Sequence, residues 1–200
     1  MTTLSSNAFS IAPDNIRTLA LTGAVGSGKT TLAEALLVQA GAIASAGNVE
    51  RGSTVSDHDS LEIKAQHSLQ SSLMHMQCGD TRIHMIDTPG LPDFAGQILP
   101  ALEAVETAAI VIDAAKGIEP MTQRLMQYAA GCKLDRIIIV NKIDAPDADL
   151  PALLQQIQQT FGKECLPLNL PDAGASKVVD CFFNREGHSI VNHYTYAFLG

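Results

Sequence analysis

The residues best suited to do chemistry lie in three short motifs, and the first is Gly23-Ala-Val-Gly-Ser-Gly-Lys-Thr30, which fits the pattern GxxxxGK[ST]. Its glycines let the backbone curl until successive N–H groups face one phosphate, and a helix starting there adds the positive end of its dipole. Lys29 would reach the outer phosphates, and Thr30 would offer its hydroxyl to Mg²⁺. The alternative is a glycine-rich turn without a ligand, which the strand-like run before the motif and the helical run after it disfavour. The residues expected at the nucleotide are Ala24, Val25, Gly26, Ser27, Gly28, Lys29, Thr30 and Thr31.

The second motif is Asp87-Thr-Pro-Gly90, at the end of the apolar run 82–86. An Asp that emerges from a strand beside a phosphate loop can hold Mg²⁺, here through a water. The N–H of Gly90 can approach a γ-phosphate because no side chain blocks it. A Pro-Gly turn after a strand is common by itself, so this interpretation depends on the first motif. Lys29, Asp87 and Gly90 are the expected catalytic groups.

The third motif, Asn141-Lys-Ile-Asp144, follows the apolar run 136–140. Asp144 would accept hydrogen bonds from the ring N–H and the exocyclic amine of guanine. Adenine lacks that pair of donors, so the motif favours guanine. Asn141 would support the loop and the base edge, while the stem of Lys142 would cover one face of the ring. Asn and Asp often flank strands as turn residues, so this motif is informative only together with the other two.

Short apolar runs that alternate with helical segments predict the elements that position these motifs. The alternation is typical of an α/β fold with a mostly parallel sheet and helices on both faces, and the first motif indicates the P-loop NTPase type. We expect strands over 16–22, 72–77, 82–87, 108–113 and 136–140, and helices over 30–40, 94–106, 119–132 and 150–161. The strands over 72–77 and 82–87 should form a hairpin around residues 78–81, with His75 opposite His84. Two facing histidines could bind a metal, but a solvated sheet face is favoured because no third ligand is evident.

The bulk composition is that of a globular chain of 200 residues, 46% hydrophobic and 17% charged, which suits one ordinary domain. No apolar stretch approaches the ~20 residues of a membrane helix, and the first residues lack the features of a secretory signal. Four cysteines without a CxxC pair indicate reduced thiols. The net charge of −8 and the 4% of aromatic residues argue against a nucleic-acid-binding surface. We therefore expect a cytoplasmic protein, with no membrane partner and no direct sequence-specific binding of nucleic acid.

Beyond these inferences, the chain resembles the GTP-binding domain of the translational GTPases, and elongation factor G most of all. The resemblance is carried by GKTTLAEALL at 28–37, DTPGLPDF at 87–94, DAAKGIEPMTQ at 113–123 and VNKID at 140–144. It implies binding of GTP and GDP with Mg²⁺, hydrolysis of GTP that drives a conformational switch, and a ribosomal partner reached through the full-length protein.

The same resemblance divides the chain into a polar tail (1–15), a GTPase domain (16–164) and a C-terminal segment (165–200). In that last segment, LPLNLP at 166–171 and VVD at 178–180 resemble the start of the subdomain that elongation factor G inserts into its GTPase domain. The final base-binding Ser-Ala element of the family is absent. The resemblance therefore implies the N-terminal piece of a longer, divergent paralogue, whose GTPase domain is incomplete at its C-terminal end.

The resemblance also suggests a third Mg²⁺ ligand. Glu62-Ile-Lys-Ala-Gln-His-Ser68 lies where the family has an ExxRGIT-like segment, so Ser68 would join Thr30 and Asp87 at the metal in the GTP state. The alternative is an ordinary serine of a surface loop.

Two departures from the family leave the activity open. Leu91 replaces the histidine that orients the attacking water, and leucine cannot hydrogen-bond a water. Gly26 stands where the family commonly has Asp. His67 could replace the missing group, although an exposed loop histidine is the simpler interpretation. The chain is then a GTPase with slow intrinsic hydrolysis, or a GTP-binding regulatory or degenerate paralogue with little or none. A P-loop ATPase or kinase would prefer ATP, which Asp144 argues against.

Overall fold

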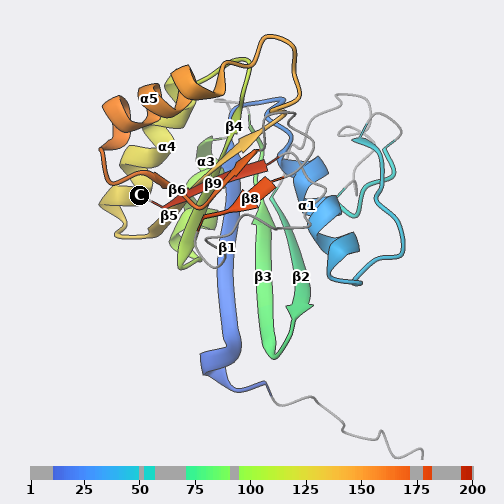
Figure 1. Cartoon of the computed structure of the whole chain (residues 1–200). Coiled ribbons are helices and arrows are strands. Elements are labelled where there is room, and N and C mark those ends of the chain that lie inside the picture. The colour runs from blue at the N-terminus through green and yellow to red at the C-terminus, as the bar shows by residue number, and fades with distance from the viewer. Residues whose placement is uncertain are drawn as a thin grey trace, which may run out of the picture.

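The computed structural model describes residues 11–49, 52–56, 71–90, 95–171, 178–181 and 195–199. They form a seven-stranded sheet of order β2-β3-β1-β4-β5-β9-β6, flanked by helices (Figure 1). Its strands are β1 (Ile16–Gly23), β2 (Ser72–Cys78), β3 (Thr81–Asp87), β4 (Thr107–Asp113), β5 (Asp135–Asn141), β6 (Leu166–Pro167) and β9 (Thr195–Leu199). The helices are the 3₁₀ turn η1 (Pro13–Asn15), α1 (Lys29–Gln39), α3 (Ala95–Glu103), α4 (Pro120–Gly131) and α5 (Leu150–Phe161). The predicted α/β class and every predicted strand and helix up to residue 161 are confirmed.

The four central strands β3, β1, β4 and β5 run parallel. Because they are parallel, their carboxyl ends all lie at one edge of the sheet. All three motifs of the sequence begin at that edge, after β1, β3 and β5.

Strand β4 shows why helices cover both faces of the sheet. Six of its seven residues are buried, as expected for a central parallel strand covered on both sides. Ala109 and Val111 pack in one cluster with Ala33 and Leu37 of α1. On the other face, the alternate positions of β4 pack against α3, α4 and α5. Figure 1 shows the same division, with α1 on one side of the sheet and the other three helices opposite.

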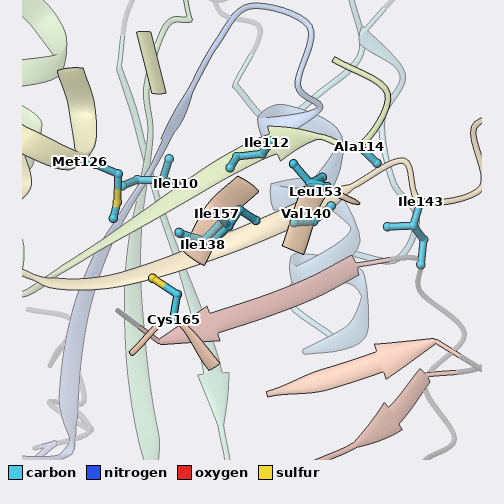
Figure 2. Packing of buried hydrophobic residues seen from close by; sticks show 10 residues of the cluster. All are labelled: Ile110, Ile112, Ala114, Met126, Ile138, Val140, Ile143, Leu153, Ile157 and Cys165. Atoms are coloured by element: carbon cyan, nitrogen blue, oxygen red, sulfur yellow. The ribbon is translucent and has the colours of Figure 1, made fainter. Parts of the chain in front are cut away.

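The largest of these clusters lies between β4, β5 and α5 (Figure 2). Side chains of β4 and β5 pack here against α5. The residues are Ile110 and Ile112 of β4, Ile138 and Val140 of β5, and Leu153 and Ile157 of α5, with Ile143 and Cys165 at the two ends of the cluster. Asp149 caps α5, because its Oδ1 accepts a 3.0 Å hydrogen bond from the N–H of Ala152. This packing holds the end of β5, and with it the third motif, in place.

Two boundaries differ from the sequence expectation. Helix α3 ends at Glu103 and not at Glu106, because Glu106 belongs to the entry into β4. Its N–H donates to Oγ1 of Thr18 at 3.0 Å, and its Oε2 accepts from the N–H of Thr18 at 3.2 Å. The hairpin places His75 opposite His84 as predicted, but Cys78 pairs with Thr81, so the loop has two residues in place of four. Gly79 adopts a φ of 58° there, a conformation that suits tight hairpin turns.

The residues after Cys165 divide between two sheets. Strands β7 (Asn169–Pro171) and β8 (Val178–Asp180) form a separate two-stranded sheet, whereas β9 pairs with β5 and β6 pairs with β9 in the main sheet. An inserted subdomain beginning at 165 therefore stays a prediction. Within the described ranges, no helix is both long enough and apolar enough to cross a membrane.

Candidate functional site

The turn between β1 and α1 forms the first part of the site. Gly26 and Gly28 adopt φ values of 74° and 91°, which side-chain-bearing residues rarely adopt. Lys29 begins α1 with only 6% of its surface exposed. Its ammonium donates hydrogen bonds to the carbonyl oxygens of Gly23 at 3.0 Å and Ala24 at 2.9 Å. The lysine is thus held across the concave side of the turn.

Burial lowers the pKa of Lys29 to about 8, although the negative charges of Asp87 and Glu119 partly oppose that shift. The positive charge of a buried ammonium is poorly compensated when its hydrogen-bond partners are two neutral carbonyl groups. An anion at this position would compensate it, so the site is electrostatically suited to a phosphate.

The end of β3 meets the start of α1. Oγ1 of Thr30 donates a 2.6 Å hydrogen bond to Oδ2 of Asp87, a carboxylate that is 1% exposed. Thr88 fixes the following turn, since both its N–H and its hydroxyl donate to the carbonyl oxygen of Leu21, at 3.1 and 2.9 Å. A hydroxyl and a carboxylate are the hard oxygen ligands that Mg²⁺ takes in proteins, so this donor pair fits the predicted ion.

Gly90 lies directly against the phosphate loop. A Cβ built on it would come within 2.7 Å of Nζ of Lys29 and 2.7 Å of the backbone N of Val25. Any other residue at position 90 would displace one of these two groups. The structure therefore supplies a physical reason for glycine in the second motif, and it brings Lys29, Asp87 and Gly90 together as predicted.

The third motif docks onto the first. Nδ2 of Asn141 donates a 3.0 Å hydrogen bond to the carbonyl oxygen of Ser27, 114 positions away in the chain. A side chain on Gly28 would collide with that amide. Nζ of Lys142 donates to the carbonyl oxygen of Gly26 at 2.6 Å. Ile143 is buried beneath the loop and Asp144 is exposed, so the carboxylate expected to select the base is open to a ligand.

Two residues that sequence reasoning missed complete this arrangement. Asp113 ends β4 and forms a 2.8 Å salt bridge with Lys142, while Glu34 lies inside α1 at 2% exposure. The carboxylate of Glu34 accepts the backbone N–H groups of Gly47 at 2.7 Å and Val55 at 2.6 Å. The sequence offered one local signal for each: Asp113 is an acid at the end of a predicted buried strand, and Glu34 is an acid beside the apolar stripe of a predicted helix.

The remaining predicted positions are only partly described. Thr31 lies exposed in the first turn of α1, and Val25 is half-buried. Ser68, His67 and Leu91 lie outside the described residues, so the third Mg²⁺ ligand and the water-orienting position stay predictions. His75 and His84 lie on the hairpin, their ring centroids 6.2 Å apart.

Comparison with known proteins agrees with this geometry. The model of the Elongation factor Tu GTP binding domain family matches residues 14–195. An elongation factor G-like protein of Mycobacterium tuberculosis is 36% identical over 159 residues, which cover 80% of this chain and 22% of that protein. Peptide chain release factor 3 of Symbiobacterium thermophilum is 35% identical over 176 residues, 86% of this chain and 33% of the relative. A crystal structure of a protein from Thermus thermophilus aligns with a TM-score of 0.77 at 36% identity, covering 82% of this chain and 24% of that one.

The chain thus spans between about a fifth and a third of the length of these curated relatives. They include release factor 3 beside the elongation factor G-like proteins that the sequence motifs resemble. The match to the family runs through all three motifs and through the strands that carry them. The chain therefore belongs to the family of the elongation factor Tu GTP-binding domain, within the translational GTPases related to elongation factor G and release factor 3.

Proposed function

We propose that this chain binds GTP and GDP with Mg²⁺ and hydrolyses GTP, and that it serves as the switch of a ribosome-associated, cytoplasmic translation factor. The observation that carries the proposal is the docking of the third motif on the first, through the 3.0 Å hydrogen bond from Asn141 to Ser27. That contact joins the segment that carries the exposed Asp144 to the turn that carries the buried Lys29, which supports one site with Asp144 and Lys29 at its two ends. A single nucleotide would then reach Asp144 with its base and Lys29 with its phosphates.

The phosphate loop and its neighbours would do the phosphoryl chemistry. Lys29 and the backbone N–H groups of residues 24–28 would bind the outer phosphates. Thr30 and Asp87 would hold Mg²⁺, which neutralises charge on the phosphate oxygens, and Ser68 would join them in the GTP state. The N–H of Gly90 would donate to the γ-phosphate, so loss of that phosphate would release the segment after β3.

Asp144 would select the base. Its carboxylate can accept two hydrogen bonds from guanine, one from the ring N–H and one from the exocyclic amine. Adenine offers no such pair, and the unmatched carboxylate would then lose its partners. Selection by Asp144 would therefore favour guanine nucleotides over the ATP of other P-loop enzymes.

A second candidate is a GTP-binding paralogue that hydrolyses little or no GTP. It is favoured by Leu91, because a leucine side chain has no group that can position the attacking water. Both candidates share the nucleotide site and differ only in the catalytic step. Residues 165–200, as the start of an inserted subdomain, would belong to either.

The first experiment is a competition titration of the chain with GDP, GTP and ATP in the presence of Mg²⁺, with thermal unfolding measured in parallel. Guanine-selective binding with a matching rise in melting temperature would support the proposal. Equal or better binding of ATP would contradict it, as would a cooperatively folded chain that binds none of the three.

The second experiment separates the two candidates. Single-turnover GTP hydrolysis is measured for the wild type, Leu91→His and Leu91→Ala. A clear rate from the wild type supports the GTPase. No rate from the wild type, with a rise for Leu91→His and none for Leu91→Ala, supports a paralogue that lost only its water-orienting group.

A further inference from the structure

We infer that Asp113 is a positioning residue for the guanine site. Its carboxylate holds the Lys142 ammonium at the carbonyl oxygen of Gly26, and this contact fixes the base loop (residues 141–144) to the phosphate loop (residues 23–30). The inference rests on the proposed function, because it concerns the same nucleotide site. Asp113 lies outside all three motifs, and its carboxylate contacts Lys142 and the N–H of Ala115.

The contact geometry places Asp113 behind Lys142. Oδ2 of Asp113 accepts from Nζ of Lys142 at 2.8 Å, and the same Nζ donates to the carbonyl oxygen of Gly26 at 2.6 Å. The other oxygen, Oδ1, accepts the N–H of Ala115 at 3.1 Å. The carboxylate is thus fixed by its own loop at one oxygen and holds the lysine with the other.

The sheet register explains why this aspartate has a defined position. Asp113 is the last residue of β4 and lies directly beside Asn141, the last residue of β5. The N–H of Ala114 donates to the carbonyl oxygen of Asn141 at 2.9 Å. The two strand ends are therefore hydrogen-bonded to each other, and the side chain of Lys142 reaches from this junction to the carbonyl oxygen of Gly26.

The position of Lys142 depends on a partner such as the Asp113 carboxylate. Its backbone has a φ of 57°, a left-handed conformation that costs a non-glycine residue free energy unless its surroundings enforce it. Its side chain is 44% exposed, against 6% for Asp113, so solvent competes for the ammonium but scarcely for the carboxylate. Without the Asp113 carboxylate, only the hydrogen bond to Gly26 would oppose the competition of water for the ammonium. The stem of Lys142 would then be held less firmly over the base.

The charge on Asp113 is maintained by its neighbours. Burial alone would raise the pKa of its carboxyl, but the hydrogen bond and charge of Lys142, the N–H of Ala115 and the charge of Lys116 together leave that pKa below its ordinary value. The carboxylate is therefore ionised throughout the neutral range. It holds Lys142 by a charge-assisted hydrogen bond, which is stronger than a neutral one.

The test is a double-mutant cycle on nucleotide release. Dissociation rates of fluorescent GDP and of a non-hydrolysable fluorescent GTP analogue are measured for the wild type, Asp113→Ala, Lys142→Ala and the double variant. Asp113→Ala should raise both rates by about tenfold. It should raise them equally, since the contact lies on the base side of the site and away from the γ-phosphate. The double variant should release nucleotide no faster than Lys142→Ala, because Asp113 acts through that lysine.

Two further variants complete the design. Asp113→Asn retains the size of the side chain and one acceptor oxygen, so its dissociation rates should lie between those of the wild type and Asp113→Ala. The same variant replaces Asp113→Ala in the cycle if Asp113→Ala does not fold. Asp135→Ala removes an exposed acid at the opposite end of β5 and should leave both rates unchanged.

The outcomes separate this inference from the function on which it rests. Additive losses in the double variant would overturn it, because the aspartate would then act independently of Lys142. A loss confined to the GTP analogue would also overturn it. If the wild type itself binds no guanine nucleotide, the proposed function fails and this inference fails with it.

Discussion

Oγ1 of Thr30 and Oδ2 of Asp87 lie 2.6 Å apart and share a hydrogen bond. One belongs to the first turn of α1 and the other to the end of β3, and the contact joins two motifs that are 57 positions apart. A hydroxyl and a carboxylate are oxygen groups of the kind that Mg²⁺ takes in proteins, so Thr30 would bind the ion and Asp87 would hold it through a water. The contact therefore marks where the proposed Mg²⁺ would bind.

Substituting Thr30 should weaken the binding of Mg²⁺ together with nucleotide. For Thr30→Ala, we expect the Mg²⁺ concentration that half-maximally slows GDP release to rise at least about tenfold, because one oxygen ligand is lost. Stopped-flow release of fluorescent GDP across a Mg²⁺ series measures this shift.

Thr81→Ala, at the far end of β3, is the matched control and should leave the Mg²⁺ series unchanged. Thr30→Ser keeps the hydroxyl and should stay close to the wild type. An unchanged Mg²⁺ midpoint in Thr30→Ala would remove this hydroxyl from the metal site.

Asp144 should account for the preference for guanine over hypoxanthine. Inosine diphosphate lacks only the exocyclic amine of guanine, so the wild type should bind GDP more tightly by about 1–3 kcal/mol, the cost of one unmatched hydrogen-bonding group. Asp144→Ala should bind the two diphosphates with similar affinity. Isothermal titration with both ligands measures the difference, and an Asp144→Ala variant that still prefers GDP would assign base selection to another group.

Lys29 should make the stability of the nucleotide-free chain depend on pH in the alkaline range. The pKa of this lysine falls from 10.5 to about 8 in the folded chain, so between these values the unfolded chain binds more protons than the folded one. The free energy of unfolding should therefore rise with pH, by about 2 kcal/mol from pH 8 to pH 10. Urea unfolding across this range measures it.

Lys29→Met removes the titrating group and should flatten that rise, while Lys133→Met, an exposed lysine after α4, should preserve it. A free energy of unfolding that falls between pH 8 and pH 10 in the wild type would contradict this prediction. It would show that Lys29 stays charged in the folded chain and that neighbouring groups balance its charge.

Glu34 should stabilise the loop that follows α1. Its two carboxylate oxygens accept the N–H groups of Gly47 and Val55, and removal of a buried acceptor leaves its donors without a partner. For Glu34→Ala we expect a loss of about 2 kcal/mol or more in the free energy of unfolding. Glu34→Gln retains one acceptor oxygen and should lose less.

Glu103→Gln is a useful comparison, because Glu103 accepts one exposed hydrogen bond from Tyr128 at 2.8 Å. It should cost less than about 1 kcal/mol. Equal losses at positions 34 and 103 would mean that the loop is held by its other contacts.

The order of the elements and the identity of the three motifs could be predicted from local sequence patterns. Alternating apolar runs predicted the strands up to β5, because their periodicity reflects burial on a sheet. The glycines of residues 23–28, Asp87, Gly90 and the segment 141–144 could be recognised because phosphate and guanine impose fixed local chemistry at short spacing.

The groups that support those motifs from distant parts of the chain became evident from the folded arrangement alone. Local patterns show only that Asp113 ends a buried strand and that Glu34 lies beside an apolar stripe. They do not show what these acids bind, because the partners lie 29 positions ahead for Asp113 and 13 and 21 positions ahead for Glu34. The early end of α3 and the pairing of β9 with β5 likewise depend on contacts between segments far apart in the chain. Hydrogen bonds of this kind follow from register and packing, which local patterns do not encode.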